Sequence, residues 1–169
     1  MENGPRDPVT GAALERRRSN LGLARTIGAE VEALYEFLPG AQLYGSYLFA
    51  DATLVSASEQ DKDLEGHQLA QIPPHTFTVG TRYSDPKLFT FVLEGRFVDE
   101  QFEDAENEQK FGSFFILNGS LSRQLPLWNG EIFIAAENLF DREYTVDLGG
   151  GIRKVGSPRL VHGGVRFRL

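Results

Sequence analysis

Three carboxylates lie close together in the segment ENLFDREY, and they are the first residues of this sequence that could do chemistry. Glu137, Asp141 and Glu143 could act as general acid and base, but no nucleophile or convergent histidine accompanies them, as a hydrolytic site would require. Asn and Asp side chains also hydrogen-bond the backbone readily at turns. We therefore expect Asn138 and Asp141 to hold the backbone where a strand enters its loop. No catalytic residue, and hence no enzyme, is predicted.

Acidic residues and histidines could also bind a metal ion, but their spacing here matches no known site. The acidic stretch at residues 99–110 lacks the glycine that an EF-hand calcium loop needs at its sixth position. His67, His75 and His162 are separated by predicted strands and show no metal-ligand spacing, and the chain has no cysteine. We predict neither metal nor cofactor. Residues 99–110 are interpreted as a charged, solvated loop, with bridging by divalent ions as the alternative.

The composition is that of a β-rich chain without a membrane helix. No run of 18 apolar residues occurs among the 169, so no transmembrane helix is expected, although barrel strands alternate and escape this test. Thirteen Phe, five Tyr and 18 Gly suit strands and turns. The net charge of -7 argues against a nucleic-acid partner, which would need a basic face. Residues 1–18 lack the apolar core of an export signal, so we expect a lost signal or the end of a longer chain.

The end of the chain, PRLVHGGVRFRL, alternates in character with a period of two. Alternate side chains of a strand point to opposite faces of a sheet. Large apolar residues on one face and arginines on the other are what a membrane barrel strand needs, with lipid outside and water inside. One face would carry Val161, Gly163, Val165, Phe167 and Leu169, and the other Leu160, His162, Gly164, Arg166 and Arg168.

The same alternation recurs along the chain and predicts about seven antiparallel strands. The fold class is therefore all-β, an antiparallel transmembrane β-barrel segment. Short turns at residues 39–40, 84–87 and 126–130 alternate with long polar loops at 56–74, 99–112 and 147–157. Outer-membrane barrels sort short turns and long loops to opposite rims in this way. The predicted strands are residues 21–37, 43–55, 77–83, 89–97, 115–124, 131–140 and 158–169.

Charged residues gather on one face of these strands, which we interpret as the face toward the barrel lumen. Burying so many charges in a dry core would cost too much free energy, whereas the interior of a closed barrel this small would be packed. The pattern therefore indicates that partner structure lies beyond the seven strands. The lumen-facing residues are Glu30, Glu32, Glu36, Arg82, Glu94, Arg96, Arg166 and Arg168.

Four segments, in order along the chain, resemble motifs of TonB-dependent outer-membrane receptors. They are SNLGLARTIGAEVE at residues 19–32, the Pro-Pro-His run at 73–75, ENLFDREY at 137–144 and GSPR at 156–159. The resemblance covers residues 19–169, so residues 1–18 would be a polar extracellular loop or a disordered start. The family usually ends in Phe, whereas this chain ends in Leu169. The motif residues carried over are Asn138, Leu139, Phe140, Asp141, Tyr144, Pro158 and Arg159.

This resemblance implies the C-terminal third of a 22-stranded receptor barrel, an incomplete part without its plug domain. It places the C-terminus in the periplasm, the long loops outside, and the protein in the outer membrane of a Gram-negative bacterium. The expected partners are outer-membrane lipid, the rest of the barrel and the plug, the TonB complex through that plug, and the barrel-assembly machinery. The implied function is TonB-energised uptake of a scarce solute such as an iron-siderophore complex, which this chain alone would not transport.

The resemblance also implies where ligand and plug are contacted, because extracellular loops bind the solute and lumen charges hold the plug. Trp128 and Tyr144 are expected near the membrane boundaries, as amphipathic aromatic residues are. The ligand-facing loop candidates are His67, Asp99, Glu103, Asp104 and Asn107. The lumen-facing plug-contact candidates are Glu30, Glu32, Arg82, Glu94, Arg96, Arg166 and Arg168.

Two other classes of β-protein compete with this interpretation. A small independent or oligomeric outer-membrane β-barrel with a structural or pore role is the main alternative. An odd strand count argues against closure of one chain, because the first and last strands would meet in parallel. A soluble lipid-binding barrel would need an apolar lumen and a polar outside, which is the reverse of the Glu/Arg pattern.

Overall fold

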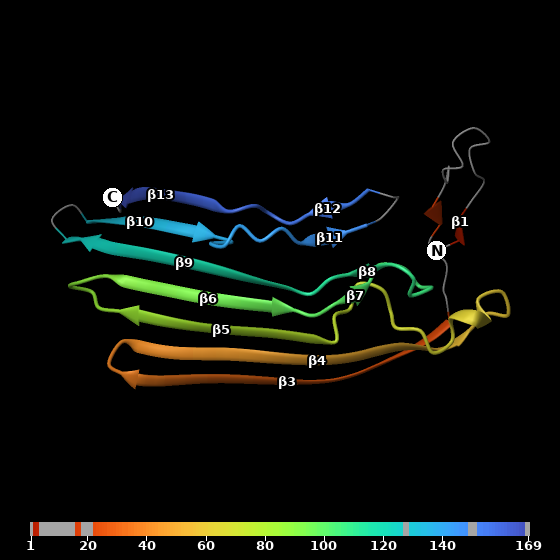
Figure 1. Cartoon of the computed structure of the whole chain (residues 1–169). Helices are drawn as coiled ribbons and strands as arrows, with labels where there is room; N and C mark the ends of the chain where they lie inside the picture. Colours follow the sequence, from red (N-terminus) through yellow and green to blue (C-terminus); the bar gives the residue numbers. More distant parts are fainter. Residues whose placement is uncertain (1, 4–15, 18–21, 127–128, 149–151, 168–169) are drawn as a thin grey trace.

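The computed structural model describes residues 2–3, 16–17, 22–126, 129–148 and 152–167, and its main feature is one antiparallel sheet (Figure 1). Seven strands are hydrogen-bonded in the order β13-β10-β9-β6-β5-β4-β3, so each strand pairs with its neighbours along the meander. The predicted all-β fold with about seven strands is confirmed. β3 and β13 form opposite edges, and the sheet is not closed. The strands are β3 (Gly22–Leu38), β4 (Ala41–Ala57), β5 (His75–Ser84), β6 (Thr90–Val98), β9 (Phe114–Leu125), β10 (Gly130–Glu137) and β13 (Leu160–Phe167).

The pairing register shows which residues lie together, because direct cross-strand partners share a face of the sheet. We call the face that contains Glu32 the polar face and the face that contains Val31 the apolar face. The predicted alternation of apolar and polar residues is confirmed by two neighbouring rows. On the polar face one row joins Glu32, Ser46, Thr78 and Arg96, and on the apolar face the next joins Val31, Tyr47, Phe77, Phe97 and Phe115.

The sheet has almost no core of its own. Val31, Ile134 and Phe167 are each more than half exposed, at 62%, 52% and 55%. A soluble sheet buries one face against a second layer, and an exposed apolar surface of this extent marks an interaction surface. The apolar face therefore requires cover from outside the sheet. Among the described residues, the buried apolar side chains are Ala41, Ala52, Leu54, Val98 and Phe111.

The connections sort by length to the two ends of the sheet, as predicted (Figure 1). Residues 39–40 and 85–89 make short turns at one end, where the N–H of Asn129 also donates to the carbonyl oxygen of Pro126. At Gly40 the backbone φ is +79°, a value that glycine adopts without strain. In the next turn the Asp85 carboxylate accepts hydrogen bonds from the backbone N–H groups of Lys87 and Leu88. The long connections all lie at the opposite end, which we call the loop end.

The loop end contains short elements that the sequence does not reveal. They are the 3₁₀ turn η1 (Lys62–Leu64) and the two-stranded ladders β7 (Gln101–Phe102) with β8 (Lys110–Phe111) and β11 (Thr145–Asp147) with β12 (Lys154–Val155). Near the N-terminus, β1 (Glu2–Asn3) pairs with β2 (Arg16–Arg17). Within the described parts of the chain, no helix is long and apolar enough to cross a membrane.

The strand boundaries differ from the predicted ones by one to three residues, and the largest difference is at the end of β10. β10 ends at Glu137, not at Phe140 as predicted. The reason is local, because Asn138 adopts a φ of +48° in the left-handed region, which ends the extended conformation. Trp128, which is predicted at a membrane boundary, lies outside the described residues. So does Arg168, which is predicted to face the lumen.

Candidate functional site

The side chain of Asn138 is buried and hydrogen-bonded at the loop end, where β10 stops. It is 3% exposed. Its Nδ2 group donates to the carbonyl oxygens of Arg142 (2.9 Å) and Ser157 (3.0 Å), and its Oδ1 accepts from the N–H of Arg142 (2.8 Å). Its own backbone N–H donates to Asn118 Oδ1 at 3.0 Å. A buried carboxamide with both donor hydrogens and its oxygen engaged is satisfied, which confirms the predicted backbone-holding role.

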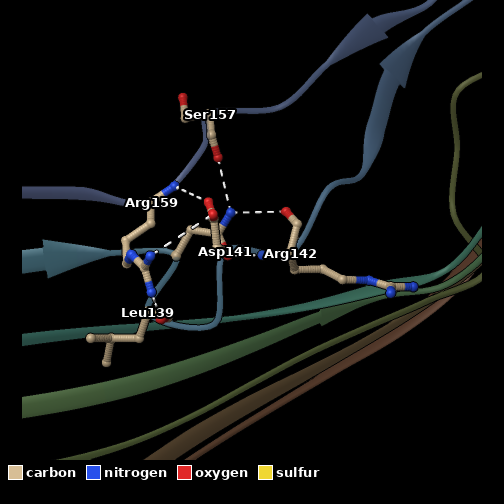
Figure 2. A network of polar contacts seen from close by, with 6 residues as sticks. Leu139, Asp141, Arg142, Ser157 and Arg159 are labelled. Atoms are coloured by element: carbon tan, nitrogen blue, oxygen red, sulfur yellow. Dashed lines mark hydrogen bonds and ion pairs between the residues drawn. The ribbon is translucent and has the colours of Figure 1, made fainter.

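Asp141 links the same turn to the start of the last strand (Figure 2). Its Oδ1 accepts a hydrogen bond from the backbone N–H of Arg159 at 2.8 Å, and the Arg159 guanidinium lies 4.0 Å from Oδ2. The other guanidinium branch reaches the carbonyl oxygen of Leu139 at 3.5 Å, while the N–H of Leu139 donates to Leu117 on β9. The ENLFDREY and GSPR segments are therefore one cross-link between the two sides of a long loop. The Asp141 carboxylate thus binds the backbone just before the first residue of the last strand.

Tyr144 completes this cross-link by packing. Its ring stacks on Phe114 with centroids 4.3 Å apart, and its carbonyl accepts from the N–H of Gly156 at 2.8 Å. A Cβ atom at Gly156 would lie 2.0 Å from the Tyr144 ring, so only glycine fits there. Phe140, by contrast, is 68% exposed, and Pro158 is also exposed. Among the motif residues, Phe140 and Pro158 thus contribute little burial.

Four of the five ligand-facing candidates come together where two long loops meet, although their sequence spacing does not reveal it. Asn107 bonds reciprocally with the backbone of Gln68: its Nδ2 donates to the carbonyl oxygen (2.9 Å) and its Oδ1 accepts from the N–H (2.8 Å). His67 Nδ1 lies 3.1 Å from the carbonyl oxygen of Ala105. Glu103 accepts a hydrogen bond from Gln71 Nε2 at 2.9 Å. We call this contact the loop junction.

Asp104 is the fourth of these candidates, and Asp99 is the fifth, which lies apart from them. The Asp104 carboxylate accepts from the N–H groups of Glu108 and Gln109, which closes the β7–β8 hairpin. Asp99 accepts from the N–H of Glu100 at the start of that hairpin and has no bond to the other loop among the described residues. The junction therefore brings together His67, Glu103, Asp104 and Asn107, and leaves Asp99 apart.

Segments that look like free loops in the sequence are paired to the sheet at the loop end. Residues 66–69 fold back along β4, where the N–H of Leu54 donates to His67 and the N–H of Leu69 donates to Ala52. In the acidic loop, Phe111 is buried at 2% exposure and Lys110 lies 4.9 Å from the Phe102 ring centroid. Lys110 also pairs with Glu100 at 2.7 Å. The loop junction is thus joined to β4 by backbone hydrogen bonds.

The charged candidates of the strands lie on one face, as the sequence predicts. The register places Glu32 and Arg96 in one row, and Arg82 and Arg166 fall on the same face by the same alternation. Glu30 and Glu94 share it. Arg168 lies outside the described residues.

Two interactions on the polar face were not anticipated from the sequence. Tyr44 OH donates to Glu94 Oε2 at 2.9 Å, and its ring reaches from β4 across Gly80 of β5. A Cβ atom at Gly80 would lie 2.2 Å from that ring. Arg166 pairs with Glu131 at 3.0 Å and its guanidinium carbon lies 5.5 Å from the Phe133 ring centroid. The first interaction ties β4 to β6 across β5, and the second ties β10 to its neighbour β13.

The site has the chemistry of a binding wall. In the described residues, no group of three His, Cys, Asp or Glu side chains could hold a metal ion. What the arrangement offers is a polar, charged face, an apolar face and a rigid, hydrogen-bonded rim at one end.

A family model for the TonB dependent receptor-like β-barrel matches residues 2–139. The chain belongs to the TonB-dependent receptor β-barrel family. Its membership agrees with the open meander and with the motif cross-link described above. No curated protein sequence matches the chain closely enough to count as a relative.

Solved receptor structures share this fold at low sequence identity. The ferric yersiniabactin uptake receptor FyuA of Yersinia pestis is 21% identical with a TM-score of 0.74, over 88% of this chain and 24% of its own. The ferric citrate transporter FecA is 23% identical with a TM-score of 0.73, over 85% of this chain and 24% of its own. The copper transporter OprC is 21% identical with a TM-score of 0.67, over 85% of this chain and 23% of its own. The chain thus spans about a quarter of the length of these structures.

Proposed function

We propose that this chain is part of the wall of an outer-membrane receptor that takes up a scarce solute, such as an iron-siderophore complex, with energy from the TonB complex. The observation that carries the proposal is the two-faced, open sheet of a family-member barrel. Its apolar face needs lipid, its polar face needs water or protein, and all long connections lie at one end. The receptors FyuA and FecA, which are similar in fold, take up iron chelates.

The membrane setting of the proposal follows from the two faces. The apolar face lies against outer-membrane lipid in a Gram-negative bacterium, with the loop end outside the cell and the short turns in the periplasm. The polar face lines the lumen and contacts the plug through ion pairs and hydrogen bonds. Its plug contacts are Glu30, Glu32, Arg82, Glu94, Arg96, Arg166 and Arg168.

Solute binding is assigned to the loop junction. His67, Glu103, Asp104 and Asn107 lie together there, and the hydrogen bonds between the loops hold them in fixed positions. A rigid rim lowers the conformational entropy that binding must remove. Asp99 adds a carboxylate at the start of the β7–β8 hairpin. Iron chelates carry oxygen and nitrogen groups that such side chains can hydrogen-bond.

The remaining partners complete a transport cycle that this chain cannot carry out alone. A plug domain blocks the lumen, the TonB complex acts through that plug, and the barrel-assembly machinery inserts the strands. Because the chain covers about a quarter of the solved receptors, the transported solute and these partners are parts of the proposal.

The test is uptake in a strain that lacks siderophore receptors. The chain is expressed with an export signal, alone and together with the remaining barrel and plug of a family receptor, and radioactive iron-siderophore uptake is measured. We expect uptake only from the combination, and reduced uptake when Glu103 and Asn107 are both replaced by Ala. A matched control replaces Glu59 and Glu106, exposed loop carboxylates outside the candidate set. Uptake by the chain alone would refute this assignment and favour a small independent or oligomeric barrel.

A further inference from the structure

The outer edge of β3 is the longest unpartnered feature of the sheet. β3 contains 17 residues and pairs along one side with β4, and no described residue pairs with its other side. All of its residues are exposed. An edge strand presents a row of free N–H and C=O groups, which template the pairing of another strand. Within the proposed function, which this inference rests on, the next strand of the barrel wall occupies this edge.

The side chains along this edge carry negative charges that form no ion pair with the other described strands. Glu30, Glu32 and Glu36 all lie on the polar face of β3. Their direct partners on β4 are the uncharged residues Leu48, Ser46 and Gln42. None of the ion pairs among the described residues includes these three glutamates.

Two other polar-face carboxylates have a partner on another strand. Glu131 on β10 pairs with Arg166 on β13 at 3.0 Å, and Glu94 on β6 accepts a hydrogen bond from Tyr44. On β3, Glu36 accepts only from the N–H of Gly40 in its own turn. The three glutamates therefore have no basic partner on β4, and the open edge of β3 is where a further strand could supply one.

We propose that β3 pairs with an antiparallel strand of the remaining barrel wall that carries Lys or Arg at the positions opposite Glu30, Glu32 and Glu36. Each carboxylate has two acceptor oxygens, so Glu30 and Glu32 can bind this strand and the plug at the same time. Directly opposed side chains on one face lie close enough to interact, and opposite charges there stabilise pairing whereas like charges oppose it. A basic strand thus matches this edge in charge as well as in hydrogen bonding. The edge selects its neighbour during assembly of the wall.

A second copy of this chain fits the edge less well. With seven antiparallel strands, β3 and β13 run in the same direction, so head-to-tail pairing would be parallel, which is less stable per residue. β13 has 8 residues and would leave much of the 17-residue edge open. Pairing two β3 edges would bring glutamates of the two copies onto one seam.

The test is disulfide trapping. The chain has no native cysteine, so only the introduced cysteine can form a disulfide. Val31→Cys, on the apolar face of β3, is introduced in the full chain refolded in lipid vesicles with a synthetic antiparallel strand. Two strand peptides differ only in Lys or Glu opposite residues 30, 32 and 36, and each carries one cysteine opposite position 31. We expect about tenfold more cross-linking with the Lys peptide, because three opposite-charge pairs each contribute roughly twofold.

Variants and salt show whether the glutamates cause the preference. Replacing all three by Gln, E30Q/E32Q/E36Q, should remove it, as should high salt. E59Q/E106Q/E108Q removes the same charge from exposed loop positions and should retain it. The peptide exchange leaves the chain unchanged, so the comparison does not depend on folding of the variants.

The outcomes separate this proposal from the proposed function. Equal cross-linking of both peptides would overturn the charge complementarity and leave the receptor-wall assignment standing. Cross-linking of neither peptide, or of two copies through position 31, would overturn both, because the edge would then not be the seam of a larger wall.

Discussion

Replacing Asn138 by Ala should open the loop end while leaving the strands paired. The substitution removes three hydrogen bonds, two to Arg142 and one to Ser157. A net contribution of about 1 kcal/mol for each bond gives about 3 kcal/mol for the local opening. The buried position, 3% exposed, makes loss of a bond costly, but water entering at the loop end would offset part of it.

Amide hydrogen exchange in vesicles measures this opening free energy directly. About 3 kcal/mol corresponds to roughly a hundredfold faster exchange, expected at the N–H groups of Arg142 and Arg159 and absent from central amides of β6. Phe140→Ala changes an exposed residue of the same motif and should leave exchange nearly unaltered. Equal protection of Arg142 in the two variants would refute the reasoning that Asn138 holds the turn.

Two further substitutions test other contacts. Gly80→Ala places a Cβ atom 2.2 Å from the Tyr44 ring and should destabilise the sheet by about 1–3 kcal/mol. The loss is measured as a lower urea midpoint of unfolding. Gly112→Ala, with open space around its Cβ, is the control, and equal midpoints of the two variants would contradict the packing. Asn107→Ala removes both reciprocal bonds to Gln68 and should speed proteolysis of residues 58–74 several-fold. Glu106→Gln, on an exposed side chain of the same loop, should not, and equal cleavage rates would show that the loop junction does not restrain the loops.

The strands and their two faces could be predicted because their signal is periodic. A period of two fixes the face of each residue within a strand, and short turns carry that parity to the next strand. The register then places Glu32 and Arg96 in one row of the polar face, although they lie on strands far apart in sequence. The motif residues Asn138 and Asp141 were also found, because Asn and Asp have specific backbone chemistry at turns.

The loop end could be predicted only in part. The β7–β8 and β11–β12 ladders have two or three residues in each strand, too few to show alternation. The junction partners Gln68 and Asn107 are separated by 39 positions, and a contact at that separation leaves no periodic trace. The end of β10 was placed too late, because nothing in the residue types shows that Asn138 takes a positive φ.

The central claim is that one face of the sheet meets lipid and the other meets water or protein. Single cysteines along β6, a strand inside the sheet, test it in the cysteine-free chain inserted into vesicles, with a water-soluble thiol reagent. Phe91→Cys, Leu93→Cys and Phe97→Cys should be protected from the reagent, whereas Glu94→Cys and Arg96→Cys should be labelled. Labelling of all five at one rate, or protection in the opposite alternation, would contradict the account.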